Sequence, residues 1–165
     1  MADGTEMPAG VDAQNALIVE TTPGTIVIKL HSDIAPGHAE RLKLLARERF
    51  YDDVPFHRVI DGFMAQTGDG EHGNGTGGSS YPDLKAEFSD KPFTRGTVGM
   101  ARAGNPNSAN SQFFIMFDDG DFLNGQYTVI GEVVSGMDVV DKLKRGEPPA
   151  QPDRIVKMQV AADAK

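Results

Sequence analysis

Arg58 is the residue in this 165-residue chain whose setting most strongly suggests chemistry. It lies in the run Phe56-His57-Arg58-Val59-Ile60, and the alternation of side chains along a strand would place Phe56, Arg58 and Ile60 on one face. A guanidinium keeps its charge and carries five N–H donors, so apolar surroundings must still supply acceptors for it. A structural ion pair and a binding pocket would both meet that need.

Two glutamines repeat this pattern. Gln66 and Gln112 are amides set in runs whose other members are mostly large and apolar, the second run being Gln112-Phe113-Phe114-Ile115-Met116-Phe117. An apolar pocket with a few converging polar groups is the usual form of a small binding site. The three side chains together therefore favour a pocket over an isolated structural ion pair.

The composition excludes several other kinds of site. The chain has no cysteine, so disulfides, thiolate nucleophiles and cysteine-ligated zinc are excluded. Its four histidines are not spaced as a metal pair, and no nucleophile elbow is present. The glycine-rich segment 68–82 lacks the ending of a nucleotide-binding loop. We therefore predict neither a metal nor a cofactor.

The charge balance and the absence of long apolar runs limit the partners. With 24 acidic against 16 basic residues, the net charge of -8 argues against nucleic acid and against an anionic membrane. No window resembles a membrane helix, and the first fifteen residues do not read as a secretory signal. We expect a monomer in the cytoplasm, or in the periplasm if a signal was removed before this numbering begins.

The hydrophobic pattern predicts one domain over residues 16–165 after a flexible leader at 1–15. Strands are expected near 17–20, 25–30, 54–60, 97–100, 112–117, 128–134 and 154–160. The strand at 112–117 should be central, because both of its faces are apolar. Many short strands with only two helices predict a mainly β fold, either a closed antiparallel barrel or a sandwich.

Two helices are expected between these strands. The first covers 36–47 and should present His38, Glu40, Lys43 and Arg47 to solvent. The second should begin at a capping box of Ser135 and Asp138 and end at Gly146.

Three segments, 56–66, 74–78 and 100–114, resemble the cyclophilin family of peptidyl-prolyl isomerases in residue type, order and spacing. The resemblance, to single-domain bacterial-type members, implies a closed eight-stranded antiparallel β-barrel capped by two α-helices. It also implies an enzyme that accelerates rotation about X-Pro bonds in proline-containing peptides and in unfolded or partly folded proteins, assisting protein folding.

The resemblance also assigns a site, with Arg58 as its catalytic residue. The substrate-binding positions that it implies are Phe63, Met64, Gln66, Gly75, Ala101, Arg102, Ala103, Gln112, Phe114, Phe122, Leu123 and Tyr127. Phe122 stands where many members carry tryptophan, and because it has no indole N–H we expect only weak binding of cyclosporin. Arg102 stands where asparagine is common, which should matter little if the backbone makes the contact.

Isomerisation of an X-Pro bond would require no nucleophile. The bond resists rotation because of its partial double-bond character, and twisting it returns a lone pair to the proline nitrogen. A donor such as Arg58 would gain this acceptor only in the twisted state. Two other functions remain as alternatives: a lipocalin-like carrier of an apolar ligand, and a module that binds proline peptides without turnover.

Overall fold

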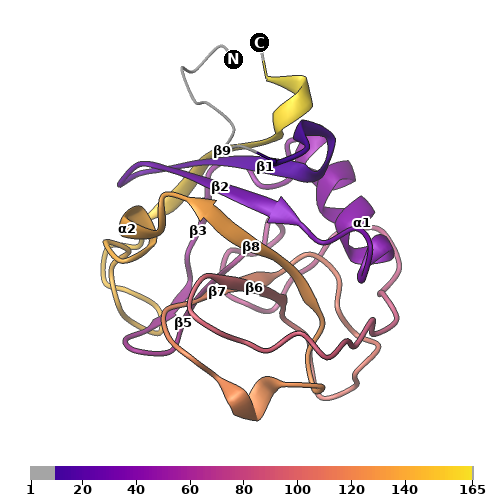
Figure 1. Ribbon diagram of the computed structural model, residues 1–165. Coiled ribbons are helices and arrows are strands. Elements are labelled where there is room, and N and C mark those ends of the chain that lie inside the picture. Colours follow the sequence, from indigo (N-terminus) through magenta and orange to yellow (C-terminus); the bar gives the residue numbers. More distant parts are fainter. Residues whose placement is uncertain (1–9, 165) are drawn as a thin grey trace.

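The computed structural model describes residues 10–164 and contains one curled antiparallel sheet of nine strands (Figure 1). The strands are β1 Ala16–Thr21, β2 Thr25–Leu30, β3 Val54–Pro55, β4 Arg58–Ile60, β5 Met64–Thr67, β6 Thr97–Met100, β7 Phe113–Met116, β8 Val129–Ser135 and β9 Arg154–Val160. Helix α1 (Pro36–Arg47) and the short α2 (Met137–Val140) lie at opposite ends of the curled sheet, and both contribute to its inner apolar cluster. Short 3-10 turns occupy η1 (Ala13–Asn15), η2 (Asp121–Leu123) and η3 (Ala161–Asp163).

The strand order explains the curl. It runs β3-β9-β1-β2-β8-β6-β7-β5-β4, and the two end strands, β3 and β4, are separated in sequence only by Phe56 and His57. This short connection brings the two ends of the sheet together, although no ladder joins β3 to β4 among residues 10–164. The predicted barrel-like, mainly β architecture is confirmed, with nine short strands in place of eight.

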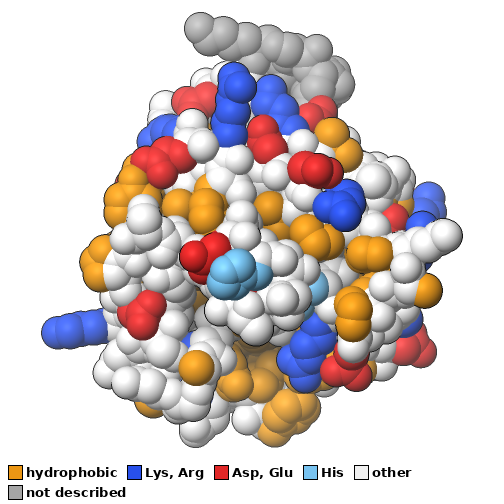
Figure 2. Space-filling model, turned by 180° about the vertical axis from the view of Figure 1, so that it is seen from behind, with side chains coloured by type: hydrophobic (Ala, Val, Ile, Leu, Met, Phe, Trp, Pro, Cys, Tyr) orange, Lys and Arg blue, Asp and Glu red, His pale blue; other side chains and the backbone are white. Residues whose placement is uncertain are grey.

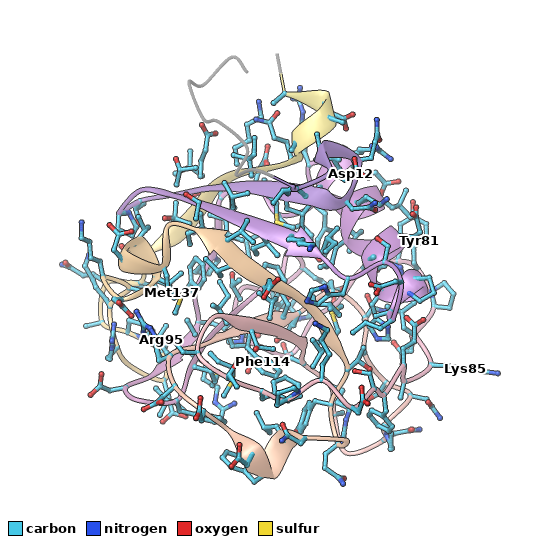
Figure 3. All side chains as sticks on the ribbon, viewed as in Figure 1. Asp12, Tyr81, Lys85, Arg95, Phe114 and Met137 are labelled. Atoms are coloured by element: carbon cyan, nitrogen blue, oxygen red, sulfur yellow. The ribbon has the colours of Figure 1, made fainter. Side chains whose placement is uncertain are left out.

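The core lies inside the curl, and a second apolar cluster lies outside it. Phe113 and Ile115 of β7 belong to the inner cluster, whereas Phe114 and Met116 belong to the outer one. Strand β7 pairs with both β5 and β6, which confirms its predicted central position. Figure 3 shows Phe114 on the side of the sheet away from β1 and β2.

Helix α1 has the predicted bounds, but part of its predicted solvated face is buried. The His38 ring is fully buried, and its Nδ1 lies 2.5 Å from Glu87 Oε1. Lys43 is buried as well, and its Nζ donates to Gln14 O and to Asn15 Oδ1, both at 3.3 Å. Segments distant in sequence cover these two side chains, so the prediction that they face solvent was wrong.

Both ends of α2 differ from the prediction, because the helix ends at Val140 and not at Gly146. Ser135 still pairs with Val27 in the β2–β8 ladder, so it is not free to cap a helix. The N-cap is Gly136 in the left-handed region at φ 87°, without a side-chain cap. An added Cβ at Gly136 would lie 2.3 Å from Thr25 O, so this turn requires glycine.

The predicted strand at 54–60 is interrupted. Phe56 is buried in the inner cluster, whereas the Arg58 side chain is 44% exposed, so the two do not share a face. At the break Phe56 N donates to Asp153 O at 2.8 Å and Val59 N donates to Gly146 O at 2.8 Å. The chain leaves β3 and enters β4 there, and this change of direction turns Arg58 outward.

The predicted leader lies partly outside the described residues, which exclude positions 1–9. Within the described part, ordered structure begins before Ala16, because Asp12 caps η1 by accepting from Gln14 N at 3.0 Å. No helix among residues 10–164 is long and apolar enough to cross a membrane.

Candidate active site

Arg58 extends from β4 on the outer side of the sheet. Its Nη1 donates to Gln66 Oε1 at 3.3 Å, and its Nε donates to Glu147 Oε1 at 3.3 Å. The Glu147 carboxylate is itself 58% exposed, so this ion pair is screened by water and holds the guanidinium only weakly. Nη2 has no hydrogen-bond partner within residues 10–164. Arg58 is therefore neither buried nor locked in place by carboxylates.

Beside Arg58 lies a cavity of about 140 Å³. Its lining consists of Arg58, Phe63, Met64, Gln66, Ala101, Arg102, Phe114, Leu123 and Tyr127. On the face shown in Figure 2, hydrophobic side chains gather in a hollow in the lower half, next to a basic side chain. The structure thus places most of the predicted site residues around one small cavity, whose walls combine aromatic and aliphatic side chains with Arg58, Gln66 and Arg102.

Strands β5 and β7 position the floor of this cavity. Their register sets Met64 opposite Met116 and Gln66 opposite Phe114. The Phe114 ring stacks on Phe93, with 5.8 Å between centroids, and meets Tyr127 edge-on at 5.9 Å. These contacts fix the aromatic wall, because a ring held on two sides has few rotamers available.

Two amides and two backbone carbonyls form a polar chain that ends at Arg58. Gln112 Nε2 donates to Gly75 O at 3.0 Å and to Gly77 O at 2.9 Å. Gln112 Oε1 in turn accepts from Gln66 Nε2 at 3.0 Å, and Gln66 Oε1 accepts from Arg58. The outward position of the guanidinium is therefore supported by a connected network.

A larger and more polar cavity of about 450 Å³ adjoins the first, because Gln66, Ala101 and Arg102 line both. It holds three further predicted residues, Gly75, Ala103 and Gln112. Its other lining residues, which the sequence did not single out, are Thr76, Gly77, Gly78, Ser79, Asp83, Ser108 and Asn110.

Two predicted residues have settings that the sequence did not reveal. Phe122 lies outside both cavity linings, is 70% exposed, and leans on Phe63 with 5.5 Å between centroids. The Arg102 guanidinium lies 4.3 Å from the Tyr127 ring centroid and donates to Gln126 O at 2.7 Å and to Ala103 O at 2.9 Å. Arg102 therefore links the segment at 101–103 to the segment at 126–127, both of which border the small cavity.

His57 and Asp69 flank the site and were missed. The His57 ring is buried and neither nitrogen has a partner in the described part of the chain; burial lowers its pKa. Asp69 is buried beneath the glycine-rich loop, where it accepts several backbone N–H groups. An aspartate directly before a run of glycines was the signal that could have identified it, because such residues organise turns.

Comparison with known proteins decides the family. The model of the cyclophilin-type peptidyl-prolyl cis-trans isomerase family matches residues 16–160. The chain belongs to the cyclophilin family. It is an enzyme of the peptidyl-prolyl cis-trans isomerase class, and cyclophilins bind proline-containing peptides.

Individual relatives agree with this assignment to the cyclophilins. A probable peptidyl-prolyl cis-trans isomerase of Brucella suis is 56% identical, over 95% of this chain and 88% of the relative. A cyclophilin structure from Hirschia baltica has a TM-score of 0.87 at 30% identity and covers 94% of this chain and 77% of that one. A Cryptosporidium parvum cyclophilin, solved in the presence of the dipeptide Ala-Pro, has a TM-score of 0.82 at 26% identity over 88% of this chain and 98% of that one.

Proposed function

We propose that Arg58 accelerates X-Pro isomerisation by donating a hydrogen bond to the proline nitrogen as the bond twists. One observation carries the proposal: a half-exposed guanidinium, with Nη2 unpartnered in the described residues, lies at the border of a cavity of about 140 Å³ that aromatic side chains line. A cavity of that size with aromatic walls suits a proline ring, and Arg58 then faces the bond before the ring.

One hydrogen bond from Arg58 is strong enough to change the rate of isomerisation measurably. The barrier to peptide rotation is about 18–20 kcal/mol, and it arises from conjugation of the nitrogen lone pair. In the twisted state this lone pair becomes an acceptor, and a hydrogen bond from a charged donor is worth about 1.5–3 kcal/mol. That gain corresponds to roughly ten- to a hundredfold in rate, because the planar ground state does not share it. No covalent intermediate is needed.

The other cavity residues would bind and orient the peptide. Phe63, Met64, Phe114 and Leu123 offer apolar contacts to the ring, and Tyr127 closes the cavity edge-on to Phe114. Ala101 borders both the ring site and the larger cavity, and Ala103 borders the larger cavity, positions suited to the residues before proline. A fixed, partly dry pocket of this kind strengthens the single contact from Arg58.

The biological setting follows from this chemistry. We propose that the clients are unfolded or partly folded proteins, because an X-Pro bond must be accessible to enter the cavity, and that the enzyme assists their folding. That it acts as a monomer in the cytoplasm, with the periplasm as the alternative, stays a prediction, as does the absence of nucleic-acid and membrane partners. Weak cyclosporin binding, expected because Phe122 has no indole N–H, also stays a prediction.

The experiment compares Arg58→Ala with wild type in cis/trans exchange of a short X-Pro peptide. We expect the catalysed rate to fall about ten- to a hundredfold with the folded state retained, because the side chain is half exposed. Arg47→Ala is the matched control: its guanidinium is 46% exposed, and its Nε contacts Asp163 at 2.9 Å, far from the site. Equal rates for the two variants would contradict the mechanism, and a wild type that binds peptide without turnover would favour the binding module.

A further inference from the structure

We propose that Asp69 is a positioning residue for Arg58, acting through the glycine-rich loop 70–78, Gln112 and Gln66. This inference rests on the proposed role of Arg58. It assigns to a buried carboxylate, which touches neither cavity, control over the orientation of the side chains that do.

The Asp69 carboxylate is the centre around which the loop is built. The side chain is almost completely buried, at 1% exposure. Its oxygens accept from the backbone N–H groups of Glu71 (3.1 Å), His72 (2.8 Å), Asn74 (3.2 Å), Gly75 (2.9 Å) and Gly77 (3.0 Å). Residues 70–78 form no strand or helix, so these bonds replace the ladder that would otherwise hold the backbone.

The space around the carboxylate is filled. An added Cβ at Gly77 would lie 2.3 Å from Asp69 Oδ1, and one at Gly75 would lie 3.1 Å from His57 Nε2. Gly75 also has φ 96°, a conformation that a side chain disfavours. The loop can therefore adopt this path only with glycine at these positions and an acceptor at Asp69.

The carboxylate remains ionised at neutral pH. Burial alone would raise the pKa of Asp69, but the N–H groups of His72, Gly77, Asn74 and Gly75 lower it to about 2. An asparagine has nearly the same shape but only one accepting oxygen, and its NH₂ group would face some of these donors. The site thus requires the charge as well as the shape.

The loop fixes the orientation of Arg58 through the side-chain amides of Gln112 and Gln66. Gly75 O and Gly77 O can only accept, so they require the NH₂ of Gln112 to face them. The oxygen of Gln112 then faces the NH₂ of Gln66, and the oxygen of Gln66 faces Arg58. Reversal of either amide would present a donor to the next donor, so the two carbonyls held by Asp69 determine that Arg58 meets an acceptor.

The test is Asp69→Asn, with Asp12→Asn as the matched control. Asp12 also accepts backbone N–H, from Gln14 at 3.0 Å, but in η1, remote from the site. At a temperature where all variants are folded, we expect Asp69→Asn to lose about tenfold in kcat/KM, mainly in kcat, and Asp12→Asn to match wild type. An unchanged rate in folded Asp69→Asn would overturn the proposal.

A double mutant separates positioning from a general loss of structure. If Asp69 acts through Gln112, Asp69→Asn combined with Gln112→Ala should be no slower than Gln112→Ala alone, within about twofold. If the two losses multiply instead, they contradict this relay, that is, the chain of hydrogen bonds from the loop through Gln112 and Gln66 to Arg58. Gly77→Ala offers a second route, because its Cβ would displace the carboxylate without removing it, and the same tenfold loss is expected.

NMR provides a readout that does not depend on turnover. In Asp69→Asn the side-chain signals of Gln112 Nε2, Gln66 Nε2 and Arg58 Nε should shift, whereas Asp12→Asn should leave them unchanged. Unmoved signals would refute the relay even if the enzyme were slower. A wild type with no exchange activity, together with shifted signals, would instead count against the proposed function and leave the relay standing.

Discussion

The two faces of β7 are similarly apolar, but one packs in the interior of the fold and the other borders the candidate site. Phe113 and Ile115 face the interior and are completely surrounded, with the Phe113 ring edge-on to Tyr51 at 5.7 Å between centroids. Phe114 faces outward and is nearly as buried, yet it forms a wall of a cavity of about 140 Å³ that Arg58 borders. The degree of burial therefore does not separate core from site in this fold.

The difference lies in what completes each cluster. The inner cluster is closed by apolar side chains from nearly every strand and from α1. The outer cluster is smaller and ends at polar groups, namely Arg58, Gln66 and Arg102. A second apolar cluster that ends at ordered polar groups provides a place for a ligand, whereas one that ends at further apolar groups provides stability.

The pair Phe113→Ala and Phe114→Ala tests this contrast with the largest expected effect. Phe113→Ala should lower the free energy of unfolding by about 3–5 kcal/mol, because it empties a filled interior. Phe114→Ala should cost less stability, because its ring already borders a cavity, but should lower the exchange rate and weaken peptide binding. Urea unfolding and peptide titration of both variants measure this. A larger stability loss for Phe114→Ala would show that the outer cluster is core.

The stability of the polar border should depend on pH through Asp69. Its pKa in the folded protein is about 2, below the ordinary value of 3.8, so its contribution is complete above about pH 4 and is lost as pH falls toward 2. The lowering corresponds to about 2 kcal/mol. The stability advantage of wild type over Asp69→Asn should therefore shrink by about this amount as the pH falls from neutral toward 2. Parallel unfolding curves over that range would contradict the assignment.

Arg102→Ala should have the smallest effect. Its guanidinium donates to Gln126 O and to Ala103 O and covers Tyr127, which stabilises the edge of the small cavity that Arg102 also lines. Loss of an exposed cation–π contact is worth about 0.5–1 kcal/mol, so KM should rise about two- to fivefold with kcat nearly unchanged. Steady-state exchange kinetics measure both constants. A loss confined to kcat would show that Arg102 acts on the reaction itself.

Local patterns in the sequence predicted the elements that depend on local forces. The bounds of α1 and β9 follow from the helical spacing of Leu42 and Leu45 and from the strand pattern after Pro152, and the structure confirms both predictions. The alternation in β7 correctly predicted two covered faces. The groups around Arg58 were named from the resemblance to cyclophilins, and the structure brings all of them except Phe122 to the two adjoining cavities.

What the sequence missed depends on contacts between distant segments. His38 is buried because Glu87, 49 positions away, covers the start of α1. Arg58 turns outward because the sheet changes strands at Phe56 and His57, a consequence of its curl. Asp69 gave only a weak signal in the sequence. Its role becomes apparent only where its loop contacts Gln112, the residue directly before β7. None of these contacts leaves a periodic pattern in the chain.

The most direct test measures the exchange of the bound peptide itself. NMR exchange spectroscopy of an X-Pro peptide saturated with Arg58→Ala separates the rotation step from binding, because free peptide no longer contributes. We predict that the peptide still binds in the cavity walled by Phe114 while cis/trans exchange on the enzyme slows about ten- to a hundredfold relative to wild type. On-enzyme exchange as fast as in wild type would contradict the central claim that Arg58 performs the chemistry of the outer face.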